Sequence, residues 1–187
     1  MSDLDLFESF PKIKRLNENC VVTEKIDGTN AQVMITPEGI VAAGSRSRWI
    51  TPEADNYGFA KWAANNAEEL KKLGVGRHYG EWWGSKIQRG YGLTEKRFSL
   101  FNTARPVETV PTCCSVVPVL YVGPLDLAQI NRVMADLFAS GSRAAPGFMK
   151  PEGVVITFHR ERYKMTFDHP KGKWTALVDN VQQPVVL

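Results

Sequence analysis

The stretch Lys25-Ile26-Asp27-Gly28-Thr29-Asn30 constrains the fold most strongly, because it places a lysine beside an Asp-Gly turn. An apolar run, Cys20-Val21-Val22, precedes it and predicts a strand that ends near the lysine. A lysine fixed between a strand and a turn can be aimed at a phosphate, and nearby cations favour the neutral amine that attacks phosphorus. Asp-Gly turns also occur in ordinary hairpins, so this stretch alone leaves both interpretations open.

Further motifs follow along the chain. Ser45-Arg46-Ser47-Arg48 comes at the end of a hairpin predicted from Ala31–Ile35 and Ile40–Ala43. The others are, in order, Gly80-Glu81-Trp82-Trp83-Gly84, Phe98-Ser99-Leu100-Phe101-Asn102, Glu152-Gly153-Val154-Val155-Ile156 and Arg162-Tyr163-Lys164. This order resembles that of the covalent nucleotidyltransferases, the superfamily of ATP-dependent ligases and mRNA capping enzymes.

In detail the sequence is similar to the RNA ligase 2 class of that superfamily. The residues of likeness are Glu24-Lys25-Ile26 before Gly28-Thr29-Asn30, Arg46 before Ile50-Thr51-Pro52, and Gly80-Glu81 before Gly84 and Ile87-Gln88. The resemblance spans residues 24–164. It implies an α+β fold, a ligase-type nucleotidyltransferase (adenylation) domain whose antiparallel sheets are flanked by helices, with a nucleotide cleft between them.

The resemblance also implies a reaction in three steps. Lys25 forms a lysyl-AMP intermediate with ATP, AMP passes to a 5′-phosphate, and a 3′-hydroxyl then attacks that phosphate and seals the strand. RNA is the favoured substrate, as a nicked duplex or a broken stem, while DNA ends and RNA-DNA hybrids stay open. A free lysine amine is mostly protonated at neutral pH, so the site is expected to supply neighbouring positive charge.

Residue roles follow from the same resemblance. It assigns catalysis to Lys25, Arg46, Glu81, Glu152 and Lys164. It assigns nucleotide binding to Glu24, Lys25, Ile26, Asn30, Arg46, Glu81, Phe101, Glu152, Arg162 and Lys164. Mg²⁺, with Mn²⁺ as an alternative ion, is expected at Glu152 with help from Asp27, since carboxylate oxygen suits such ions.

Two of these assignments keep an alternative. Phe101 is expected to stack on the purine, with Phe98 as the alternative because the strand register is unknown. Arg48 is the alternative to Arg46 if the loop is shifted. The family usually has Lys-x-Lys in the last motif, so Arg162 is a departure that keeps the charge but changes its geometry. Glu81 is expected to accept hydrogen bonds from the ribose hydroxyls.

Composition agrees with a single domain. The chain has 187 residues, of which 43% are hydrophobic and 23% charged, which suits one globular core. We expect one nucleotidyltransferase domain over residues 1–187 and no separate C-terminal domain, so that another protein could supply part of the substrate binding. Net charge is +3, and the basic residues gather between His159 and Lys173, a stretch that can neutralise phosphates.

Cysteine content and the N-terminus bear on location. The cysteines, Cys20 and the adjacent Cys113-Cys114, suit neither a disulfide framework nor a zinc site. The acidic N-terminus from Met1 to Phe10 is unlike a signal peptide, and no apolar run approaches membrane-spanning length. We therefore expect a soluble cytoplasmic protein without a membrane partner.

Periodicity predicts the remaining elements. Apolar residues at helical spacing indicate helices over Ala54–Leu73 and Leu127–Phe138, and Val116–Val122 has the composition of a buried strand. Segments 104–115 and 141–151 are expected to be loops. A final hairpin, Val154–Phe158 with Arg162–Phe167, is expected to point Arg162 and Lys164 into a cleft and Tyr163, Met165 and Phe167 into the core.

Two other functions compete with the ligase interpretation. A capping-type guanylyltransferase shares the lysine motif but uses GTP, and a ligase-like module without catalysis would only bind nucleic acid. The Trp82-Trp83 pair is expected to pack in the core rather than stack on a base. His78, His159 and His169 occur in polar settings that favour solvated side chains over catalysis.

Overall fold

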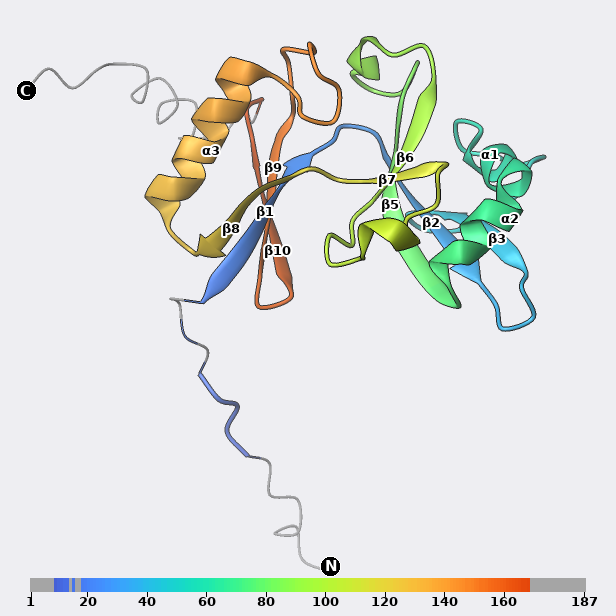
Figure 1. Ribbon diagram of the computed structural model, residues 1–187, viewed down its shortest axis with the longest axis horizontal. Coiled ribbons are helices and arrows are strands. Elements are labelled where there is room, and N and C mark those ends of the chain that lie inside the picture. The colour runs from blue at the N-terminus through green and yellow to red at the C-terminus, as the bar shows by residue number, and fades with distance from the viewer. Residues whose placement is uncertain (1–8, 14, 16–17, 169–187) are drawn as a thin grey trace, which may run out of the picture.

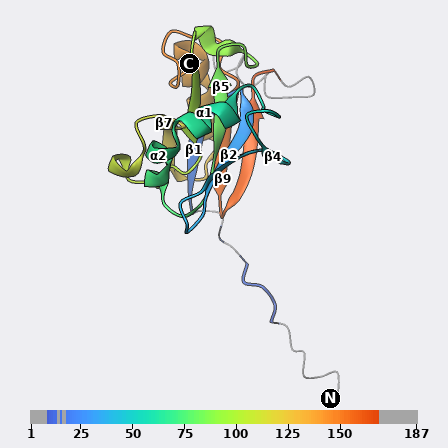
Figure 2. The same ribbon diagram turned by 90° about the vertical axis from the view of Figure 1, so that its right-hand side faces the viewer.

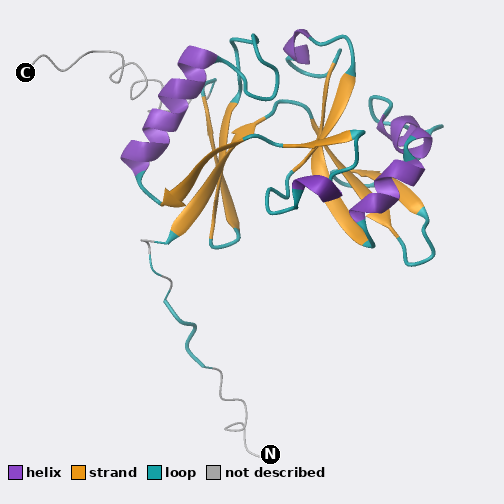
Figure 3. Cartoon of the chain, in the orientation of Figure 1, coloured by secondary structure: helices purple, strands orange, loops and turns teal. Residues whose placement is uncertain are grey.

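Two β-sheets stand side by side with helices on their outer sides (Figure 1). This arrangement is seen in a computed structural model, which describes residues 9–13, 15 and 18–168. Figure 3 marks the helices and strands by colour, with α3 beyond one sheet and α1 and α2 beyond the other. The expected α+β class, with antiparallel sheets flanked by helices, is confirmed.

The first sheet, which we call sheet A, has the strand order β10-β9-β1-β8 and is antiparallel throughout. Its strands are β1 (Asn19–Lys25), β8 (Val119–Pro124), β9 (Gly153–Phe158) and β10 (Glu161–Thr166). In β1, Cys20 and Val22 are fully buried against helix α3 (Leu127–Ser140). One face of sheet A therefore packs against α3, and the opposite face is turned toward sheet B.

The second sheet, sheet B, has the order β4-β3-β2-β5-β6-β7. All neighbouring strands are antiparallel except β6 and β7, which pair in parallel. Its strands are β2 (Thr29–Ile35), β3 (Val41–Ser45), β4 (Trp49–Ile50), β5 (Gly76–Gly84), β6 (Lys96–Leu100) and β7 (Cys114–Val116). The hairpin predicted from the sequence is confirmed as β2 and β3.

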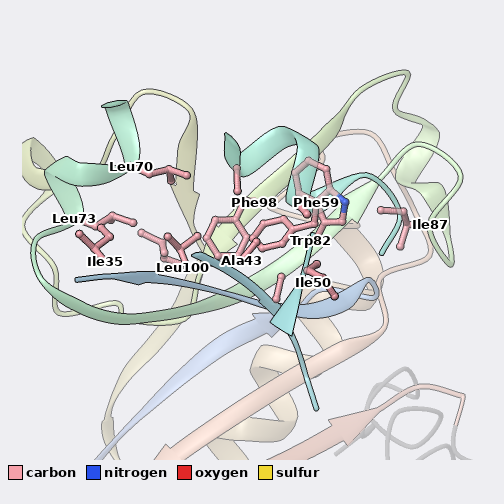
Figure 4. Packing of buried hydrophobic residues seen from close by; sticks show 14 residues of the cluster. Ile35, Ala43, Ile50, Phe59, Leu70, Leu73, Trp82, Ile87, Phe98 and Leu100 are labelled. Atoms are coloured by element: carbon pink, nitrogen blue, oxygen red, sulfur yellow. The ribbon is translucent and has the colours of Figure 1, made fainter. Parts of the chain in front are cut away.

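Short helices cover the outer face of sheet B. They are α1 (Phe59–Asn65), α2 (Ala67–Leu70) and the 3-10 turn η2 (Lys71–Leu73), and they lie in front of the strands in Figure 2. Figure 4 shows the apolar core between them and the sheet, with Phe59, Trp82 and Phe98 in contact. Other short turns are η3 (Gly90–Gly92) and η4 (Val107–Thr109).

Helix α3 confirms the sequence prediction at Leu127–Phe138 and extends it to Ser140. Asp126 caps its N-terminus, because its side chain accepts a hydrogen bond from the amide of Ala128 at 2.8 Å. Gly141 ends it with a φ of 76°, which favours glycine. No helix within the described residues is long and apolar enough to cross a membrane.

The helix predicted over Ala54–Leu73 is wrong in its extent. Asn66 has φ −111° and ψ 16°, outside the helical region, and it separates α1 from α2. Before α1, the Asp55 side chain accepts the amides of Ala60 and Lys61 at 2.8 and 3.1 Å, which fixes this segment as a turn rather than a helix.

The buried strand predicted at Val116–Val122 is also wrong. The chain changes sheets there, since β7 ends at Val116 in sheet B and β8 begins at Val119 in sheet A. Because β8 is an edge strand, Val122 is 61% exposed. The loop expected at 104–115 contains η4 and the start of β7, whereas 141–151 has neither helix nor strand, as predicted.

The hairpin of β9 and β10 is confirmed. Its turn residues, His159 and Arg160, have φ of 49° and 70°, the backbone geometry of tight two-residue hairpins. Met165 is buried as predicted, but Tyr163 is 56% exposed, so its expected place in the core is wrong. Tyr163 lies toward the turn of an edge strand, where α3 does not cover it.

The Asp-Gly stretch is not a hairpin turn, because it carries the chain from sheet A to sheet B. β1 ends at Lys25 and β2 begins at Thr29. Ile26 is buried in a separate apolar cluster with Trp83 and Val117. Gly28 lies against the backbone of β5, where an added Cβ would clash with the Trp82 carbonyl oxygen and lie 2.7 Å from the Trp83 Cβ.

Replacing Gly28 by alanine should therefore lower the free energy of unfolding by about 1–3 kcal/mol, because overpacking forces the backbone apart. Urea unfolding measures this. Gly44→Ala is the matched control, since a Cβ there meets only the flexible Gln32 side chain. Equal stability of the two variants would contradict the close approach at Gly28.

Candidate functional site

A cleft of about 960 Å³ lies between the inner faces of the two sheets. Sheet A contributes Thr23, Lys25 and Val155 to its lining, while sheet B contributes Asn30 and Glu81. The volume lies within the range of pockets that hold small ligands and cofactors. The cleft is therefore large enough for a nucleotide, and it is widened near Phe101 by a smaller cavity of about 260 Å³.

Lys25 is the last residue of β1, and its partner in β9 is Gly153. Glu152 immediately precedes this partner, so the pairing brings the two side chains together. The Lys25 Nζ lies 2.7 Å from the Glu152 Oε2, and the side chains are 24% and 17% exposed. The structure thus brings together the predicted nucleophile and the predicted metal ligand as an ion pair.

Glu81 lies opposite Asn30 in the pairing of β5 with β2. Its carboxylate accepts hydrogen bonds from the Gly28 amide at 3.1 Å and the Asn30 Nδ2 at 2.9 Å. Only 7% of Glu81 is exposed, and this burial raises its pKa to about 7, although Asn30, the Lys25 charge and Gly28 each act to lower it. The carboxylate is therefore held at the junction of the sheets, close to its point of titration at neutral pH.

The predicted cations of β10 line the opposite wall. Arg162 pairs with Thr157 and Lys164 with Val155, and all four residues line the cleft. Alternation along the strand points these side chains to the inner face, as the sequence predicted. The basic residues His169, Lys171 and Lys173 lie outside the described residues.

The two pairs of alternatives left open by the sequence, Arg46 or Arg48 and Phe101 or Phe98, differ in whether their side chains line the cleft. Arg46 lines both cavities, whereas the carbonyl of Arg48 accepts hydrogen bonds from Ser45 and its side chain is absent from the cleft lining. Phe101 also lines both cavities, whereas Phe98 is fully buried in the core of sheet B. Arg46 and Phe101 are therefore the alternatives that line the cleft, and their roles stay predictions.

Glu24 was expected to bind the nucleotide, but its carboxylate accepts hydrogen bonds from another segment of the chain. It is 1% exposed and accepts hydrogen bonds from the Ser142 Oγ at 2.6 Å and from the amides of Arg143 and Ala144 at 2.7 and 2.9 Å. These partners were missed by sequence reasoning, and no local pattern marks them. Ile26, the other predicted contact beside Lys25, lines the cleft while packing into the core.

Asp27 gains no support as a metal ligand. Its Oδ2 accepts a hydrogen bond from the Arg89 Nε at 2.8 Å, and Arg89 also contacts Asp168 and the Lys150 carbonyl. Arg89 was not singled out by the sequence. Across the described residues, no group of three or more histidine, cysteine or acidic side chains could hold a metal ion. Glu152, whose carboxylate is 17% exposed, stays a predicted metal ligand.

The tryptophans pack as expected, whereas the solvated setting expected for His159 is wrong, because its side chain is only 16% exposed. Trp82 and Trp83 are 2% and 1% exposed, in agreement with packing. His78 lines the cleft, and its Nε2 lies 2.8 Å from the Gly74 carbonyl oxygen. Burial, with a smaller effect of the Arg105 charge, lowers its pKa. His159 contacts the Arg15 carbonyl and Glu18, away from the cleft.

A family model described as RNA ligase matches residues 18–175, which include every element of the cleft. The chain belongs to the RNA ligase family. This match confirms the resemblance found in the motifs. No curated protein gives a significant match to this RNA ligase family member.

Solved structures of Naegleria gruberi RNA ligase have the same fold as this family member. An apo mutant has a TM-score of 0.63 at 20% identity, a mutant with ATP and Mn 0.62 at 19%, and a mutant with AMP and Mn 0.60 at 20%. Each comparison covers 88% of this chain and 52% of the other. The chain thus spans about half the length of those ligases.

The raised pKa of Glu81 predicts a pH-dependent stability. Between the unfolded pKa, about 4.3, and the folded value of about 7, the folded state binds more protons, so stability falls as pH rises. From about pH 5 to about pH 8, we expect the wild type to lose about 2–3 kcal/mol relative to Glu81→Gln.

Urea unfolding at several pH values tests this. The exposed Glu53→Gln serves as the control and should follow the wild-type profile. Parallel profiles for wild type and Glu81→Gln would contradict the titration of Glu81 near neutral pH.

Proposed function

We propose that this chain performs the nucleotidyl transfer of an ATP-dependent RNA ligase, with Lys25 as the nucleophile. The observation that carries the proposal is the Lys25 amine inside the cleft, paired with Glu152 on the same sheet that carries Arg162 and Lys164. Membership of the RNA ligase family supports it, as does the fold shared with ligases solved with ATP and Mn.

The first step requires the Lys25–Glu152 ion pair to open. An ion pair holds the amine in its protonated form, whereas attack on phosphorus needs the lone pair of the neutral amine. An incoming polyphosphate competes for the same ammonium group and for the cations of β10. The ammonium proton of Lys25 then passes to solvent water, which leaves the lone pair free to attack phosphorus.

In the transfer itself, a bond forms between the Lys25 nitrogen and the α-phosphorus. The bond from that phosphorus to the bridging oxygen breaks, and pyrophosphate leaves with the electron pair. AMP then passes from Lys25 to a 5′-phosphate of RNA, and a 3′-hydroxyl displaces AMP to join the strands. Arg46, exposed at the end of β3, is placed to contact the phosphates during these steps.

Recognition of the nucleoside is assigned to sheet B and the crossing segment. Phe101 offers a partly exposed ring in the cleft on which a purine can stack, and Ile26 adds an apolar side chain to the same lining. Glu81 accepts hydrogen bonds from the ribose hydroxyls. Its pKa of about 7 means that protonation near neutral pH changes its strength as an acceptor.

Mg²⁺ is the metal we assign, with Glu152 as its protein ligand. When bound, the ion would neutralise phosphate charge and polarise the phosphoryl group. Glu152 is only partly buried, and its carboxylate has Lys25 as its side-chain partner. Once Lys25 leaves, a Glu152 carboxylate oxygen can bind the ion, and no other acidic residue has to move.

The decisive test is covalent labelling with nucleotide carrying label on the α-phosphate. With Mg²⁺ and ATP, we expect label on the denatured wild-type protein and none on Lys25→Ala, because the nucleophile is gone. Lys61→Ala, an exposed lysine of α1, is the control and should label normally. Labelling from GTP alone would point to a capping enzyme, and no labelling from either nucleotide would favour a binding module.

Stacking on Phe101 predicts a loss of nucleotide affinity in Phe101→Ala. Because base stacking on an aromatic side chain contributes about 1–3 kcal/mol, AMP binding should weaken by about 5- to 150-fold. Equilibrium dialysis measures this without turnover. Phe101→Tyr should bind nearly as the wild type does, and an unchanged affinity in Phe101→Ala would rule out the stacking role.

A further inference from the structure

We propose that the inner face of sheet B binds an unpaired RNA strand on a shelf formed by Gln32, Arg46, Trp49, Arg77 and Tyr79. This shelf extends from the nucleotide cleft to β4, the edge strand of sheet B that is labelled in Figure 2. The inference rests on the proposed function and adds to it a substrate class, RNA that is single-stranded next to the joint.

The strand register places the shelf residues on one face. Trp49 pairs with Gly44, Gly44 with Gln32, and Gln32 with Tyr79, so these positions form one row across four strands. The neighbouring positions Ala31, Ala43 and Ile50 are buried on the opposite face, against the helices. The row therefore faces the inner side of the sheet.

The aromatic members of the row are exposed. Trp49 is 50% exposed and Tyr79 is 52% exposed. The Arg77 guanidinium lies over the Trp49 ring, 5.2 Å from its centroid, and its Nη1 donates to the Gln32 Oε1 at 3.1 Å. The Gln32 Nε2 in turn donates to the Ser45 carbonyl at 3.2 Å. These contacts hold the side chains of the shelf in place before any ligand arrives.

The shelf is continuous with the nucleotide cleft. Tyr79 and Arg77 belong to the cleft lining, and the Tyr79 carbonyl accepts the amide of Phe101 at 2.9 Å. Arg46 and Gln32 line the smaller cavity beside Phe101. A strand whose end reaches Lys25 can therefore continue over Tyr79 toward Trp49.

Charge favours a polyanion on this surface. The cationic residues of the cleft lining are Lys25, Arg46, Arg77, Arg105, Arg162 and Lys164. Its acidic residues are Glu24 and Glu81, and both carboxylates already accept hydrogen bonds from the protein. Exposed aromatic rings separated by arginines are the combination that binds single-stranded nucleic acid, since phosphates meet cations while bases stack. In a duplex the bases stack on one another, so they would not stack on these rings.

Fluorescence anisotropy with a labelled single-stranded RNA of about 12 nucleotides tests the shelf. Trp49→Ala should weaken binding by about 10-fold, and Trp49→Phe should lose less because it keeps a ring. Arg77→Gln should reduce the slope of log affinity against log salt by about 0.7. Phe138→Ala, a half-exposed ring on α3, is the matched control and should leave binding unchanged.

Duplex RNA of the same length and Lys25 labelling separate the outcomes. Duplex binding and labelling from ATP should both stay within about twofold of wild type in Trp49→Ala, since Trp49 lies outside the cleft lining. Single-strand affinity unchanged in Trp49→Ala, an equal loss for duplex, or no single-strand binding by the wild type would each overturn the shelf. Absent labelling with intact shelf binding would instead overturn the proposed nucleotidyl transfer alone.

Discussion

The crossing of the chain between the two sheets is the constraint on which the site depends. Residues 26–28 alone separate the end of β1 from the start of β2. Lys25 therefore lies where the two walls of the cleft meet, and Glu81 reaches from sheet B to the amide of Gly28. Burial of Ile26 against Trp83 stabilises the crossing by about 1.5–3 kcal/mol for a fully buried side chain of this size. Fold stability and the placement of Lys25, the proposed nucleophile, thus depend on the same residues.

The acidic residues of the site bind other parts of the chain, whereas some of its basic residues have no salt bridge among the described residues and can bind a ligand. Glu24, Asp27 and Glu81 each accept hydrogen bonds from other parts of the chain, so their charge is used to hold the polypeptide. Arg46 and Lys164 have no salt bridge within the part of the chain that the structure describes. A cleft whose lining acids already accept hydrogen bonds, and in which cations such as Arg46 and Lys164 have no salt bridge in the described part of the chain, attracts anions such as polyphosphates and RNA.

Motif order and periodicity were enough to predict the α+β class, the hairpins β2–β3 and β9–β10, and helix α3. What they could not supply were contacts between distant segments. The bond between Glu24 and Ser142, and that between Asp27 and Arg89, join residues whose local sequence gives no sign of a partner. Likewise, residues 116–122 are apolar enough for one strand, but tertiary packing divides them between two sheets.

The two-residue turn at His159 and Arg160 has a consequence for how the site tolerates change. It fixes the register of β10 on β9, and the side chains of a strand alternate between faces. A slip of one residue would turn Arg162 and Lys164 outward and bring Tyr163 inward, although every residue of the strand stayed the same. The charge on the sheet A wall of the cleft therefore depends on the length of the turn as well as on the residues of β10. Insertions in this turn would be selected against, even though both turn residues lie far from Lys25 along the chain.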